Sequence, residues 1–234
     1  MSSPAPFQAL SRTGANSRYC VVIPAFNAAK TIGALVRSVK GQGLPVLVVN
    51  DGSEDQTAPI ASREGAVVIS HLRNEGKGRA LRTGFEYALR LQYDGVITMD
   101  SDGQHDPAEI AGLIQAGERQ HAGIVIGNRM ATATMPRARR WVNQLLSGML
   151  SAIIRQRIPD SQSGFRLIRK EVLTSTSLTS QRFEIETELL LAASKHRWKT
   201  ISVPVRTSYD NHSSHIRPLR DGIRFFGVVL RYLR

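Results

Sequence analysis

Two carboxylates, Asp100 and Asp102, stand one residue apart directly after the apolar run 96–99, and Gln104 follows two positions later. The apolar run is typical of a buried strand, so the acidic pair is predicted to lie in the loop that ends it. Carboxylate and amide oxygens are hard ligands, and Mg²⁺ or Mn²⁺ commonly takes one or two carboxylates together with substrate phosphate oxygens. An Asp-rich turn that bends at Gly103 is the alternative reading of the same residues.

The segments around this loop alternate between short β-branched runs and longer helical patterns. Strands are predicted near residues 19–25, 45–50, 66–70, 95–100 and 123–127, and helices near 28–41, 55–64, 77–92 and 106–120. This alternation predicts a single α/β domain with a Rossmann-like, mostly parallel sheet flanked by helices. Ligands bind beyond the carboxyl ends of the strands in such sheets. Polar clusters follow three predicted strands and are expected to meet at that edge: residues 24–27, 50–53 and 100–102.

The positive charge of the chain lies in its second half. Residues 1–117 hold 11 Lys or Arg and 11 Asp or Glu, whereas residues 118–234 hold 20 and 8, which accounts for the whole net charge of +12. Such an excess indicates an anionic partner, for which nucleic acid, anionic lipid and phosphorylated substrates all qualify. The sequence contains no recognised nucleic-acid motif and few aromatic residues among its basic ones, so no nucleic-acid partner is expected.

The cysteine content and the length of the apolar runs indicate in which cellular compartment the protein works and whether it crosses a membrane. Cys20 is the single cysteine, which excludes an intrachain disulfide and a zinc site built on cysteines and fits a reducing cytoplasm. Residues 1–18 are rich in Ser, Pro and Ala and lack the apolar core of a signal peptide, so a disordered lead-in is expected. No run reaches the ~18 apolar residues of a membrane-spanning helix. We therefore expect a protein that is soluble or rests on a membrane surface.

Two basic amphipathic helices are predicted in the second half. Residues 141–154 carry apolar pairs at four-residue spacing between arginine clusters, and residues 218–234 alternate apolar residues with arginines. Packing into the core is the commoner role of an apolar helix face. Basic amphipathic helices with aromatic residues are also typical of interfacial membrane anchors, where each arginine gains about 1 kcal/mol near anionic lipid. We expect surface attachment for the C-terminal helix, and both roles remain open for the other.

Seven short segments, in this order, resemble motifs of the family 2 glycosyltransferases, and within them the dolichyl-phosphate mannose synthase and polyprenyl-phosphate glycosyltransferase branch. They are Val22–Asn27, Val48–Ser53, Asn74–Gly78, Met99–His105, Gly127–Arg129, Asp160–Arg166 and Ser214–Pro218. The resemblance implies a GT-A domain over residues 19–217, followed by the helix at 218–234. It also implies a nucleoside-diphosphate sugar donor, linked to UDP or GDP, a divalent Mg²⁺ or Mn²⁺, and inversion at the sugar carbon.

The resemblance also implies roles for individual residues on the donor side. Asp100, Asp102 and Gln104 would hold the metal, and Asp102 would thereby serve catalysis. The nucleotide-sugar would lie against Pro24, Ala25, Phe26, Asn27, Asp51, Lys77, Asp100 and Ser101. Two departures from the family pattern put base recognition in doubt, because Ala28 replaces an acidic residue and Asn50 replaces an Asp.

Arginines are expected at the phosphates. Arg129 and Arg166 match the family's phosphate-contacting arginines, and a guanidinium fork suits phosphate oxygens. A surface position on an already basic chain is the alternative for each. The segment Asn74–Gly78 lacks the spacing of a P-loop, and its glycines would instead let the backbone approach the nucleotide at a helix start. A glycine-rich helix entry without a ligand is the alternative for this segment.

The acceptor decides whether a general base is needed. A hydroxyl acceptor needs a carboxylate to remove its proton in the transition state, whereas a phosphate monoester, with a second pKa near ~6, arrives largely ionised. The resemblance places Asp160 and Glu186 in the acceptor region, and Ser214 and His215 in a segment that closes over the phosphates. A first-turn acidic residue that complements the helix dipole is the alternative for Glu186.

These observations together predict a metal-dependent inverting glycosyltransferase. It would move a sugar from a nucleoside-diphosphate sugar to a polyprenyl phosphate, as a peripheral protein on the cytoplasmic face of a membrane, held by anionic lipid or by an integral membrane partner. A glycosyltransferase with a hydroxyl acceptor on a glycan or small molecule is the first alternative. A nucleic-acid-binding protein and a non-catalytic descendant of the fold are the remaining ones.

Overall fold

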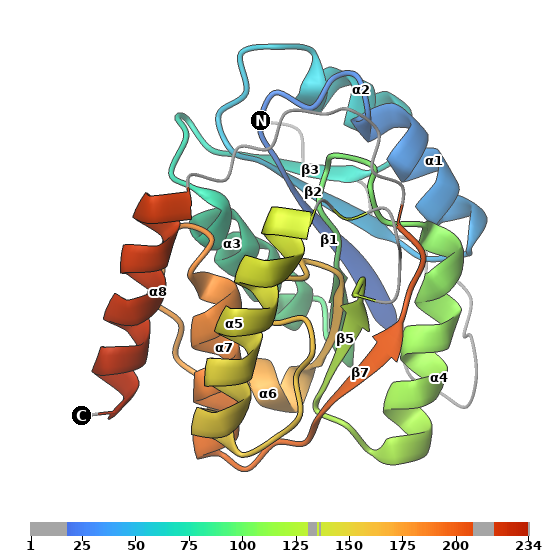
Figure 1. Cartoon of the computed structure of the whole chain (residues 1–234). Helices are drawn as coiled ribbons and strands as arrows, with labels where there is room; N and C mark the ends of the chain where they lie inside the picture. Colours follow the sequence, from blue (N-terminus) through green and yellow to red (C-terminus); the bar gives the residue numbers. More distant parts are fainter. Residues whose placement is uncertain (1–17, 131–134, 136, 208–217, 234) are drawn as a thin grey trace.

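A seven-stranded sheet with helices on both faces forms the framework of the protein (Figure 1). The computed structural model describes residues 18–130, 135, 137–207 and 218–233. Its strands are β1 (Tyr19–Ala25), β2 (Val46–Asn50), β3 (Val67–Ser70), β4 (Gly95–Thr98), β5 (Ile124–Asn128), β6 (Arg166–Arg169) and β7 (Thr200–Pro204). They lie in the order β3-β2-β1-β4-β6-β5-β7.

The sheet is parallel except at one strand. β6 runs antiparallel between β4 and β5, whereas every other pair is parallel. The residues of β1, β2 and β4 are all buried, which is why these strands read as continuous apolar runs. The predicted mostly parallel α/β sheet is confirmed, with β6 and β7 added to the five strands that the sequence indicated.

The helices form two layers. They are α1 (Ile32–Gly41), α2 (Thr57–Arg63), α3 (Lys77–Arg90), α4 (Ile110–Gln120), α5 (Arg137–Ile154), α6 (Lys170–Ser175), α7 (Ile185–Lys195) and α8 (Pro218–Leu233), with a short 3₁₀ turn, η1 (Pro107–Glu109), before α4. One core joins the sheet to α1, α2 and α4, and the other joins it to α3 and α5 through α8. Val21 and Val22 of β1 belong to opposite cores, as strand alternation requires.

The carboxyl ends of β1, β2 and β4 carry the three polar loops, and these loops are bonded to each other. The backbone N–H of Asn27, after β1, donates to Oγ of Ser53, after β2, at 2.9 Å. Oγ1 of Thr31, at the start of α1, donates to the carbonyl of Ser101, after β4, at 2.6 Å. The prediction that these loops meet at one edge of the sheet is confirmed.

Each of the two amphipathic helices has some apolar side chains packed in the core and others exposed to solvent. In α5, Leu150 and Ile154 are buried, whereas Trp141, Val142 and Leu145 are exposed. In α8, which packs against α7, one face is buried and the other is exposed: Phe225, Val228 and Val229 lie inside, and Phe226 and Leu230 lie outside. Within the described residues, no helix is long and apolar enough to cross a membrane. Most of the predicted lead-in, residues 1–17, lies outside the described residues.

Candidate active site

Three charged side chains from distant segments meet at the carboxyl edge of the sheet. Nζ of Lys77, the first residue of α3, lies 2.5 Å from Oδ1 of Asp100 and 2.6 Å from Oε1 of Glu186, in the first turn of α7. Burial alone would raise the pKa of Asp100, but the Lys77 ammonium and His105 outweigh it and hold that pKa well below its usual range. Burial opposes the charge on Lys77 too, yet Asp100 and Glu186 raise its pKa above the usual value. Asp100 and Lys77 are therefore both charged at neutral pH.

The backbone near Asp100 leaves room for its carboxylate only because residue 164 is glycine. A Cβ on Gly164 would lie 2.5 Å from Oδ2 and 2.6 Å from Oδ1 of Asp100, closer than real Cβ contacts. His105 is buried on the other side, with Nε2 3.7 Å from Oδ2 of Asp100 and its ring 5.2 Å from that of Phe165. The motif around Gly164 thus holds the first aspartate in place.

Asp102 is the more available ligand of the acidic pair. It is partly exposed, and its Oδ1 accepts a hydrogen bond from the backbone N–H of Gln104 at 3.0 Å, which closes a turn around Gly103 with φ at 74°. Its Oδ2 accepts no hydrogen bond from any described residue. A free carboxylate oxygen, a neighbouring amide and a second carboxylate fit Mg²⁺ or Mn²⁺ that is completed by substrate oxygens. The described residues contain no cluster of three or more His, Cys, Asp or Glu that could hold a metal without such oxygens.

Asp51 is tied to the glycine-rich loop before α3. Its Oδ1 accepts from the backbone N–H of Glu75 at 2.9 Å, its Oδ2 accepts from that of Gly76 at 2.7 Å, and Nδ1 of His71 lies 2.8 Å from Oδ1. Such bonds fix the loop that carries Lys77. The structure therefore gives Asp51 a positioning role beside the predicted contact with the nucleotide.

The residues after β1 differ in their access to a ligand. Pro24 and Ala25 are buried within the strand, so their side chains lie beneath the loop. Phe26 and Asn27 are exposed, and Asn27 has a left-handed backbone with φ at 50° that asparagine tolerates. Oδ1 of Asn27 also accepts from the backbone N–H of Glu54 at 3.0 Å. Phe26 is therefore the large apolar side chain of this group that is open to a ligand.

Asp160 lies in a closed polar cluster. It has no exposed surface, and it accepts from Nε of Arg129 at 2.9 Å, from Nη2 at 3.0 Å and from Nδ2 of Asn143, on α5, at 2.7 Å. Burial would raise the pKa of Asp160, but Arg129 and Asn143 lower it below its usual value. An ionised, fully paired carboxylate is a poor general base, so this geometry favours a structural role over the predicted acceptor role. It also commits two guanidinium nitrogens of Arg129 to Asp160.

Arg166 lies beneath the site. The side chain is 1% exposed, and it donates to three backbone carbonyls, those of Ser163, Ser161 and Glu186, at 2.8, 2.7 and 2.8 Å. These bonds join the loop before β6 to the start of α7. The arrangement favours a positioning role for Arg166 over the phosphate contact that the sequence predicted.

The sequence analysis did not single out two polar residues that support the site. Asn143 and Ser147 form a buried polar stripe on α5 that packs on the loop containing Asp160 and Ser161, with Oγ of Ser147 3.0 Å from Oγ of Ser161. Their four-residue spacing is the one clue that sequence reasoning could have used. The predicted acceptor residues Ser214 and His215 lie outside the described residues.

The comparisons with known proteins identify the family of the chain. The family described as glycosyl transferase family 2 matches residues 20–176. A UDP-N-acetylglucosamine–dolichyl-phosphate N-acetylglucosaminyltransferase of Methanococcus voltae is 30% identical over 217 residues, covering 82% of this chain and 86% of the relative. A polyprenol monophosphomannose synthase of Mycolicibacterium smegmatis is 28% identical, covering 80% and 76%.

A solved structure shows the fold independently. Glucosyl-3-phosphoglycerate synthase from Mycobacterium tuberculosis, in complex with Mg²⁺ and uridine diphosphate, superimposes with a TM-score of 0.72 at 21% identity, over 92% of this chain and 79% of that one. At this identity the likeness concerns the fold, and the predicted GT-A architecture is confirmed. With the matched segment spanning β1 to α6, the chain belongs to glycosyl transferase family 2 and is a glycosyltransferase.

Proposed function

We propose that the protein is a metal-dependent, inverting glycosyltransferase that moves a sugar from a UDP- or GDP-linked donor to a polyprenyl phosphate. Relatives named as dolichyl-phosphate, polyprenol and undecaprenyl-phosphate sugar transferases support this acceptor class. The observation that carries the proposal is that the candidate bases of the acceptor region, Asp160 and Glu186, are each paired with a cation, Arg129 and Lys77 respectively.

On the donor side, the residues serve a leaving diphosphate. Asp102 and Gln104 would hold the divalent cation, which when bound would neutralise charge on the leaving diphosphate. Lys77 contacts Asp100, two residues before Asp102, and its ammonium is oriented by Asp100 and Glu186. A positive charge that already points toward the developing anion needs no reorganisation during the reaction. One such donor lowers the free energy of the transition state by about 2.7–4 kcal/mol. Phe26 covers the base, and Asp51 fixes the loop from which Lys77 emerges.

On the acceptor side, paired carboxylates favour a nucleophile that needs no base. Asp160 is ionised and hydrogen-bonded to Arg129 and Asn143, so accepting a proton would break that cluster. Glu186 is likewise held by Lys77. A phosphate monoester arrives largely ionised at neutral pH and attacks without proton removal.

The exposed apolar residues support a place at a membrane surface. Trp141, Val142 and Leu145 lie on the first half of α5, and Phe226 and Leu230 on α8. The N-terminal ends of both helices lie at the end of the molecule to which the strand β5 and the strand β7 point (Figure 1). Aromatic and aliphatic side chains near basic residues suit an interface with anionic lipid, at the cytoplasmic face or beside an integral membrane partner.

One incubation tests the proposal. The protein is mixed with Mn²⁺ or Mg²⁺, a panel of UDP- and GDP-sugars and a short polyprenyl phosphate, and the products are identified by mass spectrometry. A sugar-phosphate-lipid is expected, and it should be missing with Asp102→Ala and when the metal is chelated. If the sugar is transferred to free hydroxyl acceptors and never to the lipid phosphate, the acceptor is instead a hydroxyl on a glycan or small molecule.

A further inference from the structure

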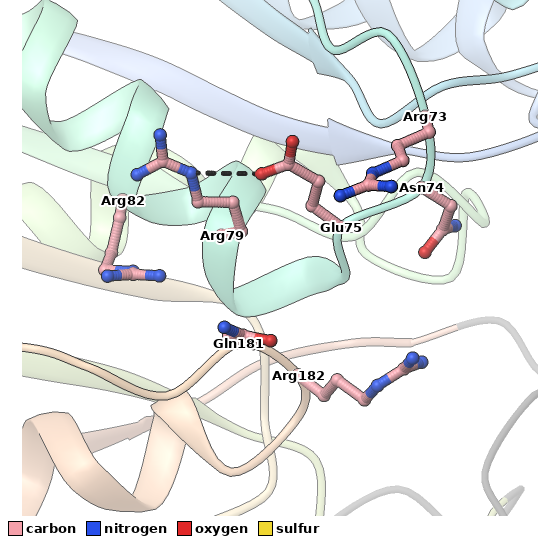
Figure 2. A pocket seen from close by; sticks show the side chains of 7 residues that line it. All are labelled: Arg73, Asn74, Glu75, Arg79, Arg82, Gln181 and Arg182. Carbon is pink, nitrogen blue, oxygen red and sulfur yellow. Dashed lines mark hydrogen bonds and ion pairs between the residues drawn. The ribbon is translucent and has the colours of Figure 1, made fainter.

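A strongly basic pocket lies beside the glycine-rich loop, and the reaction described above does not use it. It has a volume of ≈ 600 Å³ and is lined by Arg73, Asn74, Glu75, Arg79, Arg82, Gln181 and Arg182. Its arginines come from three segments: the loop before α3, α3 itself and the loop before α7 (Figure 2). The lining includes four guanidinium groups and a single carboxylate.

Most of these guanidinium donors have no protein partner within the part of the chain that the structure describes. Glu75 pairs with Nε of Arg79 at 3.3 Å, and both side chains are 40% exposed, so this pair is weak. Nε of Arg82 is buried without a hydrogen-bond partner, and its Nη1 makes one long bond of 3.4 Å to the carbonyl of Leu178. Among the described residues, the side chains of Arg73 and Arg182 form no hydrogen bond or ion pair. Arg73 and Arg182 are exposed, so their guanidinium groups are open to a ligand, and the buried Nε of Arg82 lacks the acceptor that buried donors normally have.

The walls of the pocket are fixed by the backbone. The N–H of Arg79 donates to the carbonyl of Gln181 at 3.1 Å, which ties the start of α3 to the loop before α7. This approach is possible only with glycine, because a Cβ on Gly76 or Gly78 would lie 2.5 or 2.6 Å from backbone atoms of Gln181. Asp51 holds the third wall through the N–H groups of Glu75 and Gly76. The arginines therefore surround a preformed space.

The pocket does not include the charged residues around Asp100, although Asn74 and Glu75, which line it, belong to the segment that is predicted to approach the nucleotide. Lys77 lies two residues before Arg79, so it leaves α3 on a different side, where it pairs with Asp100 and Glu186. Neither Asp100 nor Asp102 lines the pocket. A neighbouring cavity of ≈ 390 Å³ shares Gln181 and Arg182 with the pocket and reaches α8, whose outer face is partly apolar.

We infer that this pocket binds a phosphate group in addition to the diphosphate of the donor. Guanidinium forks match phosphate oxygens in pairs, and four of them around one space select phosphate over a carboxylate of single charge. The phosphate belongs either to a free anion such as pyrophosphate or to the headgroup of an anionic phospholipid. In the second case, the adjacent outer face of α8 would contact the lipid. The inference does not depend on turnover.

The test compares two double variants. Arg82→Gln with Arg182→Gln removes two guanidinium groups from the pocket, and the matched control Arg63→Gln with Arg119→Gln removes two exposed arginines from α2 and α4. Both are made in an Asp102→Ala background and measured with EDTA, so that the predicted metal site holds no pyrophosphate. One arm titrates inorganic pyrophosphate by calorimetry at low salt. The other measures flotation with vesicles of phosphatidylcholine, with and without phosphatidylglycerol.

The pocket variant should lose affinity by about tenfold or more in at least one arm, and the control should keep it. Loss in the pyrophosphate arm identifies a free anion as a ligand, and loss in the phosphatidylglycerol arm alone identifies a lipid headgroup. Arg82→Lys with Arg182→Lys keeps the positive charge but lacks the guanidinium fork, so its affinity should lie between that of the glutamine variant and that of the control. Such an intermediate affinity shows that the loss in the glutamine variant does not come from misfolding. Equal behaviour of pocket and control variants in both arms, or no binding in either, overturns the inference.

Discussion

Replacing Asp160 tests whether that carboxylate holds the structure together or removes a proton. Asp160→Asn keeps the size of the side chain but leaves the buried guanidinium of Arg129 without its counter-charge and turns one hydrogen-bond acceptor into a donor. Removing one partner of a buried ion pair costs about 3–5 kcal/mol. The free energy of unfolding of a domain is about 5–15 kcal/mol, so this change should remove a large part of it.

Urea unfolding followed by circular dichroism measures the loss. With a slope of about 1–3 kcal/mol per molar urea, the midpoint should fall by roughly 1–5 M. Glu86→Gln is the matched control, because Glu86 is exposed on α3 and has no ion-pair partner among the described residues, and it should change stability by less than about 0.5 kcal/mol. An Asp160→Asn variant as stable as the control but inactive would refute the structural role and restore Asp160 as the general base.

The same pair predicts a pH dependence of stability. The pKa of Asp160 is lowered in the folded state, so its contribution is fully present above the unfolded value near ~3.9 and is lost as the pH falls through the folded value. The wild type should therefore lose stability in acid more steeply than Asp160→Asn. Parallel curves for the two proteins between neutral pH and acid would contradict the lowered pKa.

Three further predictions concern the site and the core. Gly164→Ala should displace the Asp100 carboxylate and weaken UDP or GDP binding with Mn²⁺ by about tenfold, whereas Gly148→Ala, whose Cβ meets nothing within 4 Å, should not; equal calorimetric affinities would contradict this. Glu186→Gln should lower turnover through Lys77 without removing the response to metal, and unchanged kinetics would argue that Glu186 is not needed to orient it. Burial raises the pKa of Cys20 to about 12, so a thiol reagent should modify it only at the rate of unfolding; rapid labelling of the native protein would contradict that burial.

The sequence by itself determined the framework and the chemistry of the acidic loop. Apolar β-branched runs followed by polar clusters are local patterns, so β1, β2 and β4 and the loops after them could be read without coordinates. The carboxyl ends of parallel strands meet at one edge whatever the details of packing. For this reason the meeting of Asn27, Ser53 and Ser101 followed from the order of elements along the chain.

Only the tertiary structure decided which charged groups face each other. Lys77 and Glu186 are more than a hundred residues apart, and nothing local in either segment indicates that they pair. The antiparallel β6 brings the loop at Asp160 and Gly164 between β4 and β5, so Arg129 and Arg166 became partners of buried carboxylates and carbonyls instead of surface cations. Type and spacing determine what chemistry a residue can perform, but burial and distant partners determine which residues remain available to perform it.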